Sequence, residues 1–169
     1  MPVNKKLVLA ALFIALGLVL PLAFHSFGMG GPLFLPMHIP VLLGGLLLGY
    51  RSGFFIGLLT PLLSGLLTGM PAPLPTMPLM MGELAVYGTV AGYFYQTRGL
   101  GIYPSLLLSL IAGRLMTMVL LFFLADALHI RLSPWAYVLA ATLRGSLGLL
   151  IQVLLLPPAV GFLKKYLPH

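Results

Sequence analysis

The stretch PTMPLMMGELAVYGTVAGYFY, residues 75–95, has the composition of a membrane helix that carries one charged side chain. Nearly all of its residues are apolar or small, but Glu83 lies well inside the run. An unpaired carboxylate at the centre of a bilayer costs about 2.5–3.5 kcal/mol on insertion scales. Such a helix needs a partner for Glu83, and the rest of the chain must supply that partner.

The whole chain has the composition of an integral membrane protein. Of its 169 residues, 60% are hydrophobic and 7% are charged, whereas roughly a quarter of the residues in a soluble domain are charged. Apolar runs recur along the full length, and no polar block is long enough to form a separate soluble domain. We therefore expect one integral membrane domain over residues 1–169.

Proline, glycine and polar residues divide the chain into apolar segments that predict six helices. The expected helices span residues 6–24, 39–50, 53–69, 78–96, 103–125 and 135–163. Small residues recur at four-residue spacing, as at Gly45, Gly49 and Gly53, and this spacing lets membrane helices approach closely. The prediction is an all-α membrane protein, built as a compact bundle of six transmembrane helices.

The basic residues predict the orientation of this bundle. If both termini are cytoplasmic, the inner side holds most of the Lys and Arg residues outside the spans, and the outer loops hold only Arg131. This asymmetry follows the positive-inside rule and places the loops 25–38, 68–78 and 126–134 on the outer side. The net charge of +7 is scattered singly or in pairs. It lacks the clustered patch of a nucleic-acid binder, so the expected surroundings are lipid.

Two further charges, Arg114 and Arg144, fall within the predicted spans at depths that overlap with that of Glu83. If all three meet, two guanidinium groups face one carboxylate, and an anionic ligand would supply the missing charge. The alternative is that Glu83 and one arginine form a packing ion pair. The second arginine would then face a water-filled crevice or pair with Asp126.

Side chains suited to contact a ring surround these charges. Tyr87 lies one turn after Glu83, and Met80 lies three residues before it. His38 and Trp135 open the second and sixth predicted helices at the outer interface. For Trp135, a place in the interfacial aromatic belt is the competing interpretation.

Missing motifs favour binding over catalysis. The sequence has no GxxxxGK[ST] phosphate loop, no HExxH or GxSxG motif, and no cysteine. We expect no enzyme activity, no metal site and no cofactor bound by this chain. Two alternatives remain: a membrane enzyme that uses Glu83 and the arginines on a lipid phosphate, and a structural subunit whose charges only pair helices.

Several stretches together resemble a known family. They are the pair Ala11-xxx-Ala15, the block HIPVLLGGLLLGYRSGFFIGLLTPLLSGLLTGMP at 38–71, and ELAVYGTVAGYFY at 83–95. In this order they resemble the substrate-binding subunits, or S-components, of energy-coupling factor (ECF) vitamin transporters. The chain is most similar to the niacin-type members.

This resemblance implies a function. Such subunits capture a water-soluble vitamin at the outer face of a bacterial cell membrane. They deliver it through a coupling membrane subunit and two ATPase subunits, which use the ATP. Ala11 and Ala15 match the surface of the first helix that docks onto the coupling subunit.

The resemblance and the charges suggest one mechanism together. Arg144 or Arg114 would hold the carboxylate of an anionic vitamin, and Glu83 would orient that arginine or accept a ring N–H. Tyr87 and Met80 would pack on the ring, and the loops 25–38 and 68–78 would close over it. Nicotinate fits both the charge and the ring, whereas pantothenate fits only the charge and a pyridoxine-like ligand only the ring.

Overall fold

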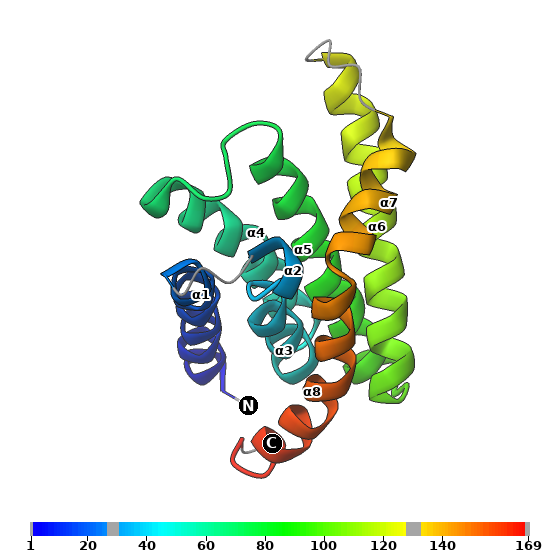
Figure 1. Ribbon diagram of the computed structural model, residues 1–169. Helices are drawn as coiled ribbons and strands as arrows, with labels where there is room; N and C mark the ends of the chain where they lie inside the picture. Colours follow the sequence, from blue (N-terminus) through cyan, green and yellow to red (C-terminus); the bar gives the residue numbers. More distant parts are fainter. Residues whose placement is uncertain (1, 27–30, 128–132, 168–169) are drawn as a thin grey trace.

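The computed structural model describes residues 2–26, 31–127 and 133–167, and in these ranges the regular structure is entirely helical (Figure 1). The predicted all-α fold is confirmed for this part of the chain. A π-helical turn, Tyr93–Thr97, continues α5 without a break. The helices are α1 (Val3–Ser26), α2 (Gly31–Phe34), α3 (His38–Leu48), α4 (Tyr50–Thr68), α5 (Thr76–Gly92), α6 (Ile102–Ala127), α7 (Pro134–Arg144) and α8 (Ser146–Lys164).

Four of these helices, α1, α4, α6 and α8, are long and apolar enough to cross a membrane. Their outward faces carry large apolar side chains. Leu66, Phe122 and Phe123, for example, are each at least 64% exposed. A surface with so many exposed apolar groups suits contact with lipid chains and not with water.

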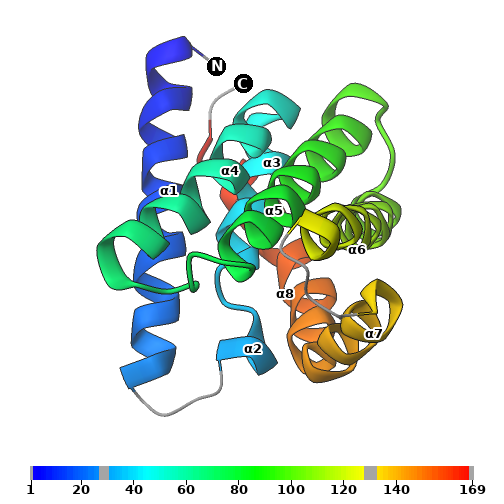
Figure 2. The ribbon, with the colours of Figure 1, turned by 90° about the horizontal axis from the view of Figure 1, so that it is seen from above.

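Helix α5 lies at the centre of the bundle. It packs against α3, α4 and α6, as the view from above shows (Figure 2). Where α4 crosses α5, Gly53 and Gly88 bring the two backbones into direct contact, and a Cβ atom on either would overlap the other backbone. The small-residue spacing in the sequence thus corresponds to close helix packing. The helix that carries Glu83 is therefore held on several sides.

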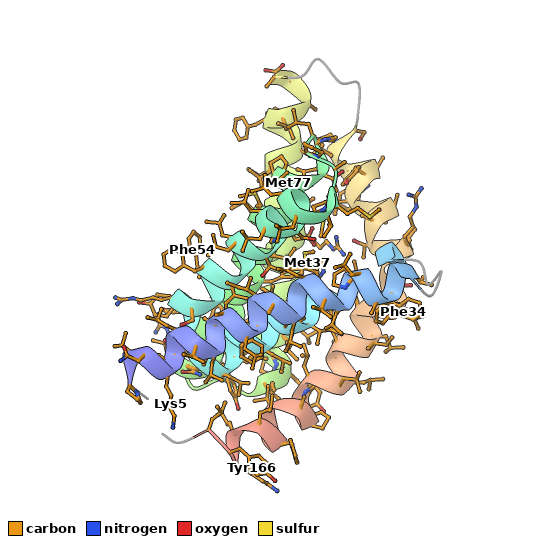
Figure 3. All side chains as sticks on the ribbon, turned by 90° about the vertical axis from the view of Figure 1, so that its left-hand side faces the viewer. Lys5, Phe34, Met37, Phe54, Met77 and Tyr166 are labelled. Carbon is orange, nitrogen blue, oxygen red and sulfur yellow. The ribbon has the colours of Figure 1, made fainter. Side chains whose placement is uncertain are left out.

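Helix α1 lies at one edge of the bundle, against α3 and α4 (Figures 1 and 2). The N-terminal end of α1 and the C-terminal end of α8 lie at the same end of the molecule. Figure 3 shows this with the labelled Lys5 and Tyr166, while Phe34 lies at the opposite end of α1. The expected outer-loop segments 27–30 and 128–132, including Arg131, lie outside the described residues.

The expected helix at 39–50 is replaced by α3, which ends at Leu48. Gly49 adopts a positive φ of 93° and its N–H donates to the Gly45 carbonyl at 2.9 Å. A side chain at this φ would be strained, so glycine permits the turn. Helix α4 then begins at Tyr50, ahead of the expected start at residue 53.

Where the sequence predicts a single helix at 135–163, the structure has two, α7 and α8, which separate at Gly145. Glycine is a weak helix former, and here Leu35 packs so closely that a Cβ on Gly145 would lie 2.8 Å from Leu35 Cδ1. Helix α8 continues through Pro157 and Pro158.

Candidate functional site

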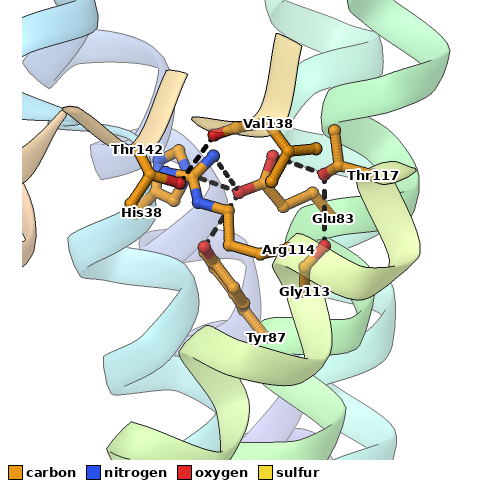
Figure 4. A network of polar contacts seen from close by, with 8 residues as sticks. All are labelled: His38, Glu83, Tyr87, Gly113, Arg114, Thr117, Val138 and Thr142. Atoms are coloured by element: carbon orange, nitrogen blue, oxygen red, sulfur yellow. Dashed lines mark hydrogen bonds and ion pairs between the residues drawn. The ribbon is translucent and has the colours of Figure 1, made fainter. Parts of the chain in front are cut away.

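The hydrogen-bond donors to Glu83 come from α5 and α6, and His38 of α3 lies within ion-pair distance. The Glu83 side chain is 7% exposed, and Arg114 Nη1 lies 2.9 Å from its Oε1 atom. Tyr87 Oη donates to the same oxygen at 2.8 Å, and Thr117 Oγ1 donates to Oε2 at 2.9 Å (Figure 4). The carboxylate is therefore neutralised and hydrogen-bonded on both oxygens, which makes its burial tolerable.

Helix periodicity explains how these groups meet. Glu83 and Tyr87 are four residues apart on α5, and Arg114 and Thr117 are three apart on α6, so each pair shares a helix face. Gly113 lets the Tyr87 ring lie against α6, because a Cβ at Gly113 would overlap the ring. The absence of a side chain at Gly113 thus allows α5 and α6 to pack closely at this point.

One edge of the Arg114 guanidinium is unused. The Arg114 side chain is 15% exposed and uses Nη1 to contact Glu83, while its buried Nε and Nη2 atoms have no hydrogen-bond partner among the described residues. A buried donor without a partner costs about 1–3 kcal/mol, and more for a charged group. Nε and Nη2 form the fork that binds a carboxylate with two parallel hydrogen bonds. Arg114 thus has two unused donors side by side, in the arrangement that suits a planar anion.

His38 lies beside the same cluster at the start of α3. It is 3% exposed, its Nε2 atom lies 3.9 Å from Glu83 Oε1, and its ring centroid lies 5.3 Å from that of Tyr87. Within the described ranges neither ring nitrogen makes a hydrogen bond, although Nε2 is close enough to Glu83 for an ion pair if the ring is protonated. His38 therefore adds an imidazole with at least one unused nitrogen, Nδ1, to the cluster.

Two buried polar residues, Thr117 and Gln152, were not predicted from the sequence. Thr117 contacts Glu83 directly, and its spacing from Arg114 on one helix face could have indicated it. Gln152 on α8 is completely buried, and both atoms of its amide group lack a partner. A lone amide in the apolar run LLIQVLLL was the available signal.

The remaining predicted site residues lie elsewhere. Arg144 is exposed at the last position of α7. Trp135 is 66% exposed and lines an open apolar groove of about 440 Å³ together with Phe122 and Phe123. Met80 is partly buried and packs against the hydrophobic core. The cluster at Glu83 therefore holds Arg114 without Arg144, so the count of two cations against one acid does not apply to it.

Two other predictions concern docking and metals. Ala11 and Ala15 are exposed on α1, as a docking surface requires. Among the described residues, no group of three or more His, Asp or Glu side chains is placed to hold a metal ion.

Comparison with known proteins identifies the family. The model of the ECF transporter substrate-specific component matches residues 5–160, which is nearly the whole chain. No curated protein and no solved structure matches it. The chain therefore belongs to the family of substrate-specific components of ECF transporters, whose members are substrate-binding transport subunits and not enzymes.

Proposed function

We propose that this chain binds a small aromatic carboxylate, with nicotinate as the best candidate, and delivers it to an ATP-driven ECF module. The observation that carries the proposal is the free Nε–Nη2 edge of Arg114, buried beside an ion pair that is already satisfied. The edge matches a carboxylate in hydrogen-bonding geometry. In this proposal the ligand's charge pairs with the free edge, while Glu83 holds the guanidinium in place.

Aromatic groups next to the fork favour a flat ligand. The ring centroids of Tyr87 and His38 are 5.3 Å apart, and both residues belong to the cluster around Glu83 (Figure 4). Nicotinate would place its carboxylate on Arg114 and its ring near these side chains. Pantothenate would use the fork but not the rings, and pyridoxine would use the rings but leave the fork empty.

A panel of vitamins tests this assignment. Purified protein in detergent is heated with nicotinate, pantothenate, pyridoxine and other vitamins, since a ligand at 100 times its Kd stabilises the folded state by about 2.7 kcal/mol. We expect a clear rise in Tm with nicotinate. Arg144→Ala should keep that rise, because Arg144 is exposed and lies outside the cluster. A folded protein that responds to no vitamin would instead support a structural subunit.

The variant Glu83→Gln does not separate binding from structure. It removes the partner of a largely buried arginine, and breaking such a pair costs about 3–5 kcal/mol whatever the role of the site. A loss of folding in Glu83→Gln is thus expected whether the site binds a ligand or only holds the helices together. Substitutions at Arg114 that keep its positive charge are more informative.

For the topology, we propose six spans with both termini in the cytoplasm of a bacterial cell. The spans would be α1, α3, α4, α5 with its π-helical turn, α6, and α7 with α8. Support comes from the positive-inside pattern and from the two chain ends lying at one end of the molecule (Figure 1). The chain has no cysteine, so single cysteines can be introduced. In intact cells a membrane-impermeant maleimide should label Ser133→Cys and spare Lys165→Cys, and the reverse labelling would contradict this topology.

Membership of the family also suggests which partner subunits this chain contacts. We propose that the exposed Ala11 and Ala15 contact a coupling membrane subunit, and that two ATPase subunits bind the ATP while this chain binds no cofactor. Small side chains allow close helix contact in lipid. An Ala15→Trp variant should bind its ligand normally but fail to copurify with the coupling subunit. Unchanged copurification would place the docking surface elsewhere.

A further inference from the structure

Gln152 is a buried polar residue that the Glu83 cluster does not use. Its side chain on α8 is fully buried, and neither its amide oxygen nor its amide nitrogen has a hydrogen-bond partner. Burying an amide without a partner is unfavourable. The only other glutamine, Gln96, is satisfied, because its Nε2 donates to the Leu46 carbonyl at 2.7 Å. Gln96 is exposed and hydrogen-bonded, whereas Gln152 is buried with both polar atoms of its amide unpaired among the described residues.

The buried face of α8 places Gln152 against the start of α3. This face consists of Gly148, Gln152, Leu156 and Val160, which follow helical spacing. Its outer end meets the segment just before α3, since Gly148 packs directly on the backbone of Phe34.

The inner part of the same face joins the hydrophobic core. Leu156 and Val160 belong to the core cluster that includes Val41 and Leu42 of α3. Gln152 lies on this face between Gly148 and Leu156, one helical turn from each. This register corresponds to the first turns of α3, where His38 also has unpartnered ring nitrogens.

Helix α8 packs against both α6, which carries Arg114, and α3, which carries His38. Three buried groups with unused hydrogen-bonding atoms among the described residues thus come from α8 and from two helices that pack on it. One ligand that reaches all of them would satisfy atoms that the protein itself leaves unpaired.

We propose that Gln152 is a ligand-binding residue that determines specificity. Its amide hydrogen-bonds a polar ring atom of the ligand that lies away from the carboxylate held by Arg114. This inference rests on the proposed function. For a pyridine carboxylate, Gln152 Nε2–H donates to the ring nitrogen, because an amide nitrogen is a donor and an uncharged pyridine nitrogen is an acceptor.

The test compares two ligands that differ only at that ring atom. Nicotinate and benzoate share the carboxylate and the flat ring, but benzoate has C–H in place of the nitrogen. Isothermal titration of the wild-type protein in detergent should give tighter binding of nicotinate than of benzoate. In Gln152→Leu we expect nicotinate to bind about two- to tenfold more weakly, the range for one neutral hydrogen bond. Benzoate binding should stay the same or improve, so that the preference disappears.

Two further measurements separate ligand binding from a structural role. Without ligand, Gln152→Leu should melt at the same temperature as the wild type or higher, because an unsatisfied buried amide is replaced by an apolar side chain. Gln96→Leu is the matched control. It should melt lower, because it loses the bond to Leu46, and should keep the preference for nicotinate.

The outcomes that overturn the inference are distinct from failure of the proposed function. If the wild type prefers nicotinate and Gln152→Leu keeps that preference, the inference fails and the proposed function stands. If the wild type binds neither ligand, the proposed function fails and this inference with it. Gln152→Met, of similar length, serves as a second variant. If neither variant folds, Gln152 has a structural role and the proposal is wrong.

Discussion

Replacing Arg114 with lysine should abolish tight ligand binding while leaving the protein folded. Lysine keeps the positive charge, and its ammonium can approach Glu83 as Nη1 of Arg114 does at 2.9 Å. It cannot reproduce the Nε–Nη2 fork. Arg114→Lys also removes the two buried donors that have no partner in the part of the chain that the structure describes. The free protein should therefore lose little stability.

The expected loss of affinity follows from the two missing hydrogen bonds. A hydrogen bond to a charged group contributes about 1.5–3 kcal/mol. Two such bonds to a ligand carboxylate would contribute about 3–6 kcal/mol, but the lysine charge retains part of this attraction. We take the lower value, about 3 kcal/mol, which corresponds to a Kd about 150-fold higher.

Isothermal titration with nicotinate measures the loss, and the melting temperature of the ligand-free variant shows whether it is folded. Arg144→Lys is the matched control, because Arg144 is exposed at the end of α7 and should not affect Kd. An Arg114→Lys protein that binds nicotinate within about threefold of the wild type would refute the role of the fork. A fall in affinity for Arg144→Lys alone would move the carboxylate site to α7.

Two more substitutions test how the site is held together. Thr117→Val removes the donor to Glu83 Oε2 and should lower the free energy of unfolding by about 1.5–3 kcal/mol and weaken ligand binding. Thr117→Ser should restore most of the stability and most of the affinity. If Thr117→Val has wild-type stability and affinity, the hydrogen bond is dispensable. Gly113→Ala should cost about 1–3 kcal/mol, because the new methyl group overlaps the Tyr87 ring. Gly161, in contrast, has open space where a Cβ would lie, so Gly161→Ala should leave stability unchanged or raise it slightly. An equal loss of stability in Gly113→Ala and Gly161→Ala would contradict the close contact between Gly113 and Tyr87.

Much of the helical framework could be predicted from the sequence. Apolar runs bounded by proline, glycine or polar residues located the helices to within a few positions, as for 103–125 against Ile102–Ala127. The break at Gly145 was missed because it depends on packing against Leu35, a residue far away in the sequence. Local sequence rules also do not predict that α8 continues through two prolines.

The candidate site was only partly predictable for a related reason. The cost of a buried carboxylate implied an arginine partner for Glu83, and depth along the helices made Arg114 and Arg144 equally good candidates. Only the direction of each side chain around its helix separates them, and this depends on how the helices pack. The free edge of Arg114 and the unpartnered amide of Gln152 are properties of the folded structure, so the sequence could indicate unusual residues but not their unused atoms.

The most direct test of the central claim is the affinity of the wild-type protein for nicotinate compared with nicotinamide. The two molecules have the same ring and nearly the same shape, but nicotinamide has a neutral amide in place of the carboxylate. If Arg114 holds the carboxylate through its free edge, nicotinate should bind at least about 100-fold more tightly, as expected for the loss of charge-assisted hydrogen bonds. Equal or tighter binding of nicotinamide would contradict the account.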